Sequence, residues 1–120
     1  MPETIYLDHN ASTPCDPRVV EAMLPYLVAR PANPSSRHHH AGRAAAQAVE
    51  ESRAKVARCL GAASATEIVF TSGATEANNL ALKGAAAALV DRGRHLATQV
   101  SEHPSVLEPL AALGRRGFDL

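Results

Sequence analysis

The spacing of hydrophobic residues along the chain changes near residue 61. Before that point apolar residues recur at helical spacing, which predicts amphipathic helices over residues 16–27 and about 41–60. After it, short apolar runs alternate with helical patterns, and these predict strands at 67–71 and 95–100, helices near 75–91 and 104–114, and the start of a further strand at 118–120. This alternation is typical of an α/β domain whose parallel strands are joined by right-handed crossovers.

Two or three parallel strands are too few to bury both faces of a sheet. The pattern therefore predicts the front of a larger α/β domain with a truncated central sheet. We expect an N-terminal arm with helices over residues 1–60 and an incomplete α/β region over residues 61–120.

Local signals mark the ends of the predicted helices. Asp16 followed by Pro17 is a favoured helix start, because the carboxylate caps free N–H groups and proline fits the first turn. Pro25 should kink or divide the first helix. Gly61 should end the second, because glycine readily adopts the left-handed conformation of a C-cap.

The run from Phe70 to Asn79, FTSGATEANN, joins a predicted strand to a long helix. Free N–H groups and the helix dipole make such a helix start suitable for a phosphate. Ser72 and Thr75 offer hydroxyl donors, and Gly73 lets the backbone approach a ligand. The run lacks the G-x-G-x-x-G and G-K-[ST] patterns, and a purely structural turn is the alternative interpretation.

A second loop follows the next predicted strand, at Ser101 to His103. Ligands of open parallel sheets bind beyond the carboxyl ends of the strands, so both loops should face one pocket if the strands are neighbours. His103 is then placed to stack on, or hydrogen-bond to, a ring attached to the phosphate. The alternative is that residues 101–104 simply cap a helix.

Composition limits the possible classes of protein. The chain has 120 residues, a formal net charge of zero and 46% hydrophobic residues, which indicates a globular domain or part of one. Neutral charge does not favour nucleic acid or membranes as partners. No apolar stretch could span a bilayer, and the first residues do not resemble a signal peptide, so we expect a cytoplasmic protein.

Neither the cysteines nor the histidines indicate a metal site. Cys15 and Cys59 are expected to be reduced, with Cys59 in the core and Cys15 in an exposed turn. The histidine triplet at residues 38–40 cannot easily share one metal ion, and we predict none.

Four motifs, in this order and spacing, resemble the N-terminal part of cysteine desulfurases, which are pyridoxal-phosphate enzymes of the class V aminotransferase group. These motifs are Leu7–Pro14, Asn33–Ser36, Thr71–Glu76 and Ser101–His103. The resemblance implies the aspartate-aminotransferase fold (fold type I), with this chain forming the start of the large domain. It also implies a homodimer when complete.

The resemblance further implies the reaction and its site. Pyridoxal 5'-phosphate would be the cofactor and L-cysteine the substrate. Alanine is released, and an enzyme persulfide passes its sulfur to an acceptor protein such as an iron–sulfur scaffold. Ser72, Gly73, Ala74 and Thr75 correspond to the residues that hold the cofactor phosphate, and His103 to a catalytic histidine that stacks on the ring and moves protons.

The chain departs from the family pattern in what it lacks. The family's cofactor-bearing lysine and persulfide-forming cysteine have no counterpart here, and Lys55 and Lys83 are predicted to lie in helices away from both loops. We therefore expect the chain alone to be inactive. Two alternatives stay open: a non-catalytic remnant that binds a partner or a phosphorylated ligand, and another class V enzyme such as a selenocysteine lyase or an aminotransferase.

Overall fold

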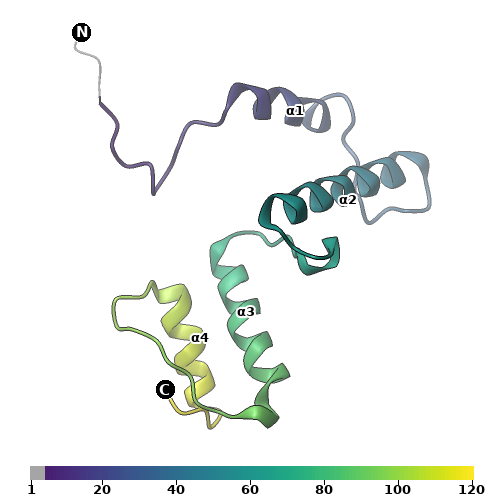
Figure 1. Cartoon of the computed structure of the whole chain (residues 1–120). Coiled ribbons are helices and arrows are strands. Elements are labelled where there is room, and N and C mark those ends of the chain that lie inside the picture. The colour runs from purple at the N-terminus through teal and green to yellow at the C-terminus, as the bar shows by residue number, and fades with distance from the viewer. Residues whose placement is uncertain (1–4) are drawn as a thin grey trace. The chain divides into compact units, whose positions relative to one another are not determined.

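Helices make up nearly all the regular structure of residues 5–120, the part of the chain that this computed structural model describes (Figure 1). The chain divides into two units, Met1–Ile68 and Val69–Leu120, which are described separately below. Residues 1–4, with which the predicted arm begins, lie outside the described residues. The predicted division into residues 1–60 and 61–120 concerns domains of the complete family fold and stays a prediction.

The first unit begins its regular structure with α1, Pro17–Leu27. The Asp16 carboxylate accepts a hydrogen bond from the backbone N–H of Arg18 at 2.8 Å, which confirms the predicted N-cap. Pro25 lies inside the helix without dividing it, because its missing N–H removes one bond only two residues before the helix ends.

Helix α2, His40–Leu60, is the longest element of the first unit. His39 caps its start, since Nδ1 accepts the N–H of Gly42 at 3.0 Å. The helix ends as predicted at Gly61, whose φ of 69° is left-handed and favours glycine. The following 3-10 turn, Ala65–Glu67, returns along α2, and the Arg53 guanidinium donates to the carbonyl oxygen of Ile68.

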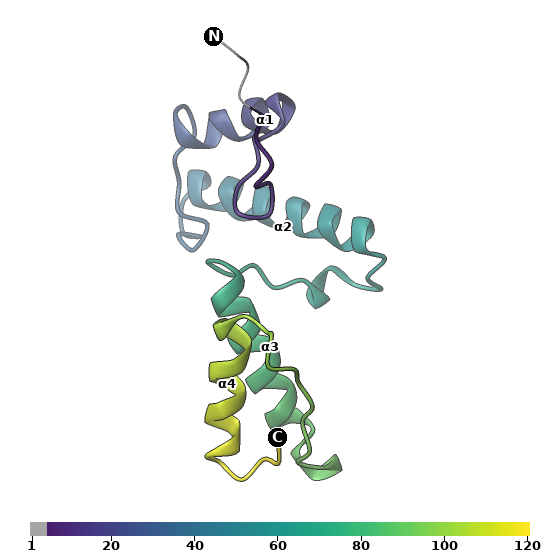
Figure 2. The same ribbon diagram turned by 90° about the vertical axis from the view of Figure 1, so that its left-hand side faces the viewer.

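The second unit pairs two helices, α3 (Ala74–Ala88) and α4 (Pro104–Gly114). Figures 1 and 2 both show them side by side, with the connecting segment running back along the pair. Ala86, Leu110 and Leu113 form the buried centre of this contact. Around it pack the partly buried side chains of Leu82, Leu96, Val106 and Phe118.

The predicted strands do not form in the described part of the chain. Its only β pairing is an isolated parallel bridge between His95 and Asp119, where Leu96 N–H donates to Asp119 O at 2.8 Å. A strand forms only where a second strand pairs with it, and the described structure has no strand over residues 67–71. The predicted truncated sheet is therefore not confirmed.

Several residues expected in a core are exposed. Cys59 is a free, exposed thiol, so its predicted place in the core is wrong; Cys15 is exposed as predicted. In the last turn of α2, Ala57 is buried whereas Cys59 and Leu60 face solvent. Val69 and Val100, in the predicted strands, are also exposed, at 62% and 97%.

Gly42 is the position where the first unit least tolerates a side chain. A Cβ at this residue would overlap the carbonyl oxygen of Ser36, in the loop that leads to α2. Gly84, in the middle of α3, would meet open space instead. The Asn33–Ser36 loop can thus lie against the first turn of α2 only because residue 42 is glycine.

We expect Gly42→Ala to destabilise the first unit by about 1–3 kcal/mol, because the loop must move away from the helix. The matched change Gly84→Ala should instead stabilise α3 by about 0.5–1 kcal/mol, since alanine is the better helix former. Urea unfolding followed by far-ultraviolet circular dichroism measures both. Equal effects of the two changes would contradict the close approach of the loop.

Candidate functional site

Thr75 and His103 lie on one cavity of about 350 Å³ between α3 and α4. The cavity is lined by Thr75, Asn79, Lys83, His103, Pro104, Ser105, Glu108 and Pro109. Thr75 comes from the first turn of α3, and His103 is the residue before α4. The packing of the two helices therefore brings the two predicted loops together without the predicted sheet.

The start of α3 has the features of an anion site. Gly73 is the N-cap and provides no side-chain capping bond, and within residues 5–120 no protein partner is recorded for the N–H groups of Ala74 and Thr75. A Cβ at Gly73 would meet no atom within 4 Å, so there is room for a ligand beside the backbone. Free N–H groups and the positive end of the helix dipole favour a negatively charged ligand here.

Ser72 behaves differently from the other predicted phosphate-binding residues. Its backbone N–H and its hydroxyl both donate to Oε2 of Glu76, at 2.6 and 2.7 Å. The backbone bond, with the hydroxyl bond second, holds the pKa of the Glu76 carboxyl below its ordinary value of 4.5. Because both donors of Ser72 are occupied, the N–H groups of Ala74 and Thr75 are the more available contacts for an anion.

His103 is held by the helix that it precedes. Its Nδ1 accepts the backbone N–H of Ser105 at 3.1 Å, which confirms that this segment caps a helix. The same Nδ1 lies 2.9 Å from the Ser105 hydroxyl. The ring itself stays exposed and lines the cavity, so capping and a site role are compatible.

Lys83 lies on the cavity, and the prediction that it is remote from both loops is wrong. Thr75, Asn79 and Lys83 are spaced four residues apart and share one face of α3. The Lys83 ammonium donates to Oδ1 of Asn79 at 2.6 Å, and Asn79 in turn donates to the carbonyl oxygen of Thr75 at 3.0 Å. This i, i+4, i+8 spacing was the signal in the sequence that could have placed Lys83 on the same face of α3 as Thr75.

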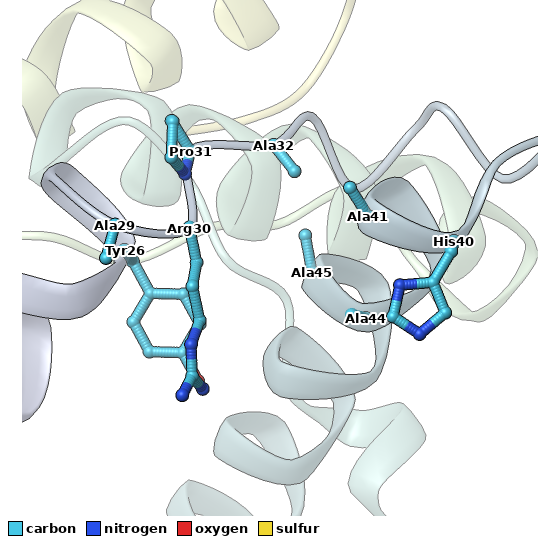
Figure 3. Close-up of a pocket in the computed structure, with 9 residues that line it drawn as sticks. All are labelled: Tyr26, Ala29, Arg30, Pro31, Ala32, His40, Ala41, Ala44 and Ala45. Atoms are coloured by element: carbon cyan, nitrogen blue, oxygen red, sulfur yellow. The ribbon is translucent and has the colours of Figure 1, made fainter.

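A separate cavity of about 430 Å³ lies in the first unit. Figure 3 shows Tyr26 and Arg30 on one side and His40 on the other, with alanine side chains between them. No hydrogen bond joins these three side chains in the described residues, and no sequence pattern predicted this cavity. Over the same residues, no three histidine, cysteine or acidic side chains lie together as metal ligands.

The sequence profile described as Aminotransferase class-V matches residues 5–120. The chain belongs to the class-V aminotransferase family. Its similar relatives include "Cysteine desulfurase IscS" of Anaeromyxobacter sp. (strain K), 52% identical over 97% of this chain and 28% of the relative. The protein of the same name from Rickettsia akari (strain Hartford) is 51% identical over the same shares.

Two solved structures resemble this class-V chain. The structure titled "NIFS-LIKE PROTEIN" superposes with a TM-score of 0.83 and 41% identity, over 96% of this chain and 31% of that one. "SspA in complex with cysteine" gives 0.80 and 42%, over 97% and 33%. The chain thus spans 28% of the length of the curated relatives above and about a third of the solved structures.

No helix among the described residues combines the length and the apolar character needed to cross a membrane.

The Ser72–Glu76 contact gives this class-V chain a testable pH dependence. The pKa of the Glu76 carboxyl is lower in the folded protein than its ordinary value of 4.5. The hydrogen bonds from Ser72 to this carboxylate therefore stabilise the loop fully above pH 4.5, and this stabilisation is lost as the pH falls through the lowered pKa of the folded protein. We expect the Ser72 amide signal in nuclear magnetic resonance (NMR) spectra to titrate with a midpoint below 4.5.

Two variants test the assignment of this titration. Glu76→Gln should abolish it, whereas Ser72→Ala should leave the midpoint lowered but by less, since the backbone bond persists. A Ser72 amide that titrates unchanged in Glu76→Gln would exclude the contact.

Proposed function

We propose that this chain supplies the phosphate- and ring-binding part of a pyridoxal-phosphate-dependent cysteine desulfurase. The observation that carries the proposal is that Thr75, at the uncapped start of α3, and His103 lie on one cavity. The names of the relatives, and a solved structure in complex with cysteine, support L-cysteine as the substrate.

The residues present fit the cofactor. A phosphate matches the donors at the start of α3: the N–H groups of Ala74 and Thr75 and the Thr75 hydroxyl. Lys83 adds a positive charge on the same cavity, and Glu108 is an opposing negative one. The exposed ring of His103 offers a flat surface against which an aromatic ring can stack.

Bound pyridoxal phosphate supplies the electron sink that weakens bonds at the α-carbon of an amino acid. This chain's own residues bind and orient. Thr75 and the start of α3 hold the phosphate. His103 contacts the cofactor ring and exchanges protons through its own imidazole nitrogen atoms. We further propose the aspartate-aminotransferase fold with its central sheet, a homodimer, a sulfur-acceptor protein as partner, and a cytoplasmic location.

We expect the 120-residue chain alone to be inactive. Lys83 is exposed and its ammonium is bonded to Asn79, and a solvated ammonium is a poor nucleophile towards a cofactor aldehyde. Incubation with pyridoxal phosphate and cysteine should give no alanine, and borohydride should fix no cofactor at a single lysine. Stoichiometric labelling of Lys83 together with turnover would contradict this expectation.

Thr75 and His103 should have separable effects in a complete enzyme. Such an enzyme is made by inserting residues 5–120 of this chain into the Anaeromyxobacter sp. (strain K) relative in place of its matching segment. Thr75→Val should weaken cofactor binding by about 1–3 kcal/mol, because a charge-assisted hydrogen bond is lost. His103→Ala should lower alanine formation by about 10²-fold or more with cofactor saturating. Cofactor titration and alanine release from cysteine measure the two effects.

Two controls accompany these variants. Thr75→Ser keeps the hydroxyl and should restore most of the cofactor affinity. Ser101→Ala changes an exposed residue near His103 and should leave both readouts unaltered. If His103→Ala turned over at the unmodified rate with full cofactor occupancy, its proposed role would be refuted.

A further inference from the structure

A chain of hydrogen bonds links α3 to the ring of His103. The side-chain amide of Asn78 donates to Oγ of Ser105 at 2.8 Å. Oγ lies 2.9 Å from Nδ1 of His103, and the backbone N–H of Ser105 donates to the same Nδ1 at 3.1 Å. Asn78 comes from the second turn of α3 and Ser105 from the first turn of α4.

The donors and acceptors in this series of hydrogen bonds can be arranged in only one direction. A backbone N–H can only donate, so Nδ1 of His103 accepts and carries no proton. Oγ of Ser105 accepts a hydrogen bond from the side-chain amide of Asn78, and its own hydroxyl proton is then donated to Nδ1 of His103. The neutral ring therefore carries its proton on Nε2.

Burial makes these bonds consequential. Ser105 is only 8% exposed and is the one buried polar residue among those described. A buried hydroxyl is costly to leave without partners, and Asn78 and His103 supply both. The His103 ring is exposed at the other end, so the fixed hydroxyl controls a group that faces the cavity.

We propose that Asn78 and Ser105 are positioning residues that fix His103 as the neutral tautomer protonated on Nε2. Resting on the function proposed above, this makes Nε2 a hydrogen-bond donor to whatever occupies the cavity. The ring can gain a second proton only at Nδ1, and that proton would end the bond from the Ser105 backbone N–H and reverse the bond with the Ser105 hydroxyl. In this neutral ring Nε2 can donate a hydrogen bond but has no free lone pair with which to accept one.

The tautomer is measured directly by NMR of the 120-residue chain labelled with nitrogen-15 in histidine, without cofactor. The His103 signals are assigned by their loss in His103→Gln. We expect one tautomer, protonated on Nε2. Ser105→Ala should lower its ratio to the other tautomer by about 2- to 10-fold, the loss of one hydrogen bond.

Asn78→Asp is the sharper variant, because it keeps the shape of the side chain and reverses its hydrogen-bonding character. A carboxylate accepts the Ser105 hydroxyl proton, so Oγ is left to accept, and the proton population on Nδ1 should rise. Asn79→Asp is the matched control. It adds the same charge one residue along, where the side chain contacts Thr75 and Lys83 instead, and it should change the ratio less.

The outcomes distinguish this inference from the proposed function. Rapidly averaged tautomers in the unmodified chain, or equal ratios in Asn78→Asp and Asn79→Asp, would overturn the positioning role. A fixed tautomer in a chain that fails to bind pyridoxal phosphate would support the positioning role while counting against the function. Helix signals of α3 and α4 in each variant show that the fold is retained, and if Ser105→Ala unfolds, Asn78→Asp decides alone.

Discussion

The apolar contact between α3 and α4 is the interaction on which the candidate site depends. Its buried members are one alanine on α3 and two leucines on α4, Ala86, Leu110 and Leu113. Burying each leucine contributes about 1.5–3 kcal/mol, and the small side chain of Ala86 lets the two helices come close. The same contact places Asn78 within hydrogen-bonding distance of Ser105 and puts Thr75 and His103 on one cavity. A loss of this packing would separate the proposed phosphate and ring contacts.

The two helix starts that border the cavity are capped in different ways, and the difference suits a ligand with two kinds of group. At the start of α4, Nδ1 of His103 accepts a hydrogen bond from the backbone N–H of Ser105, and this bond fixes the ring. At the start of α3 the N-cap residue, Gly73, has no side chain that could accept an N–H of the helix. The Glu76 carboxylate accepts hydrogen bonds from Ser72, one residue before Gly73. One helix start is therefore closed by an aromatic side chain and the other is open to an anion.

The second unit keeps its site although the described residues contain no strand. Hydrophobic residues that a sheet would cover, such as Val69 and Val100, are exposed, and the bridge between His95 and Asp119 is isolated. The high structural similarity to longer relatives of the family nevertheless shows that the path of the backbone is already that of the class-V proteins.

The sequence by itself determined the four α-helices and the family, because helix starts and ends depend on residues close in the chain. Asp16 and Gly61 act through their own caps, and the motifs around Thr75 and His103 are local as well. Only the tertiary structure decided which distant residues meet. It formed no strand at the predicted positions among the described residues, exposed Cys59, brought Lys83 onto the cavity and joined Asn78 to Ser105. Strand pairing, burial and contacts between helices depend on residues far apart in the chain, which no local pattern specifies.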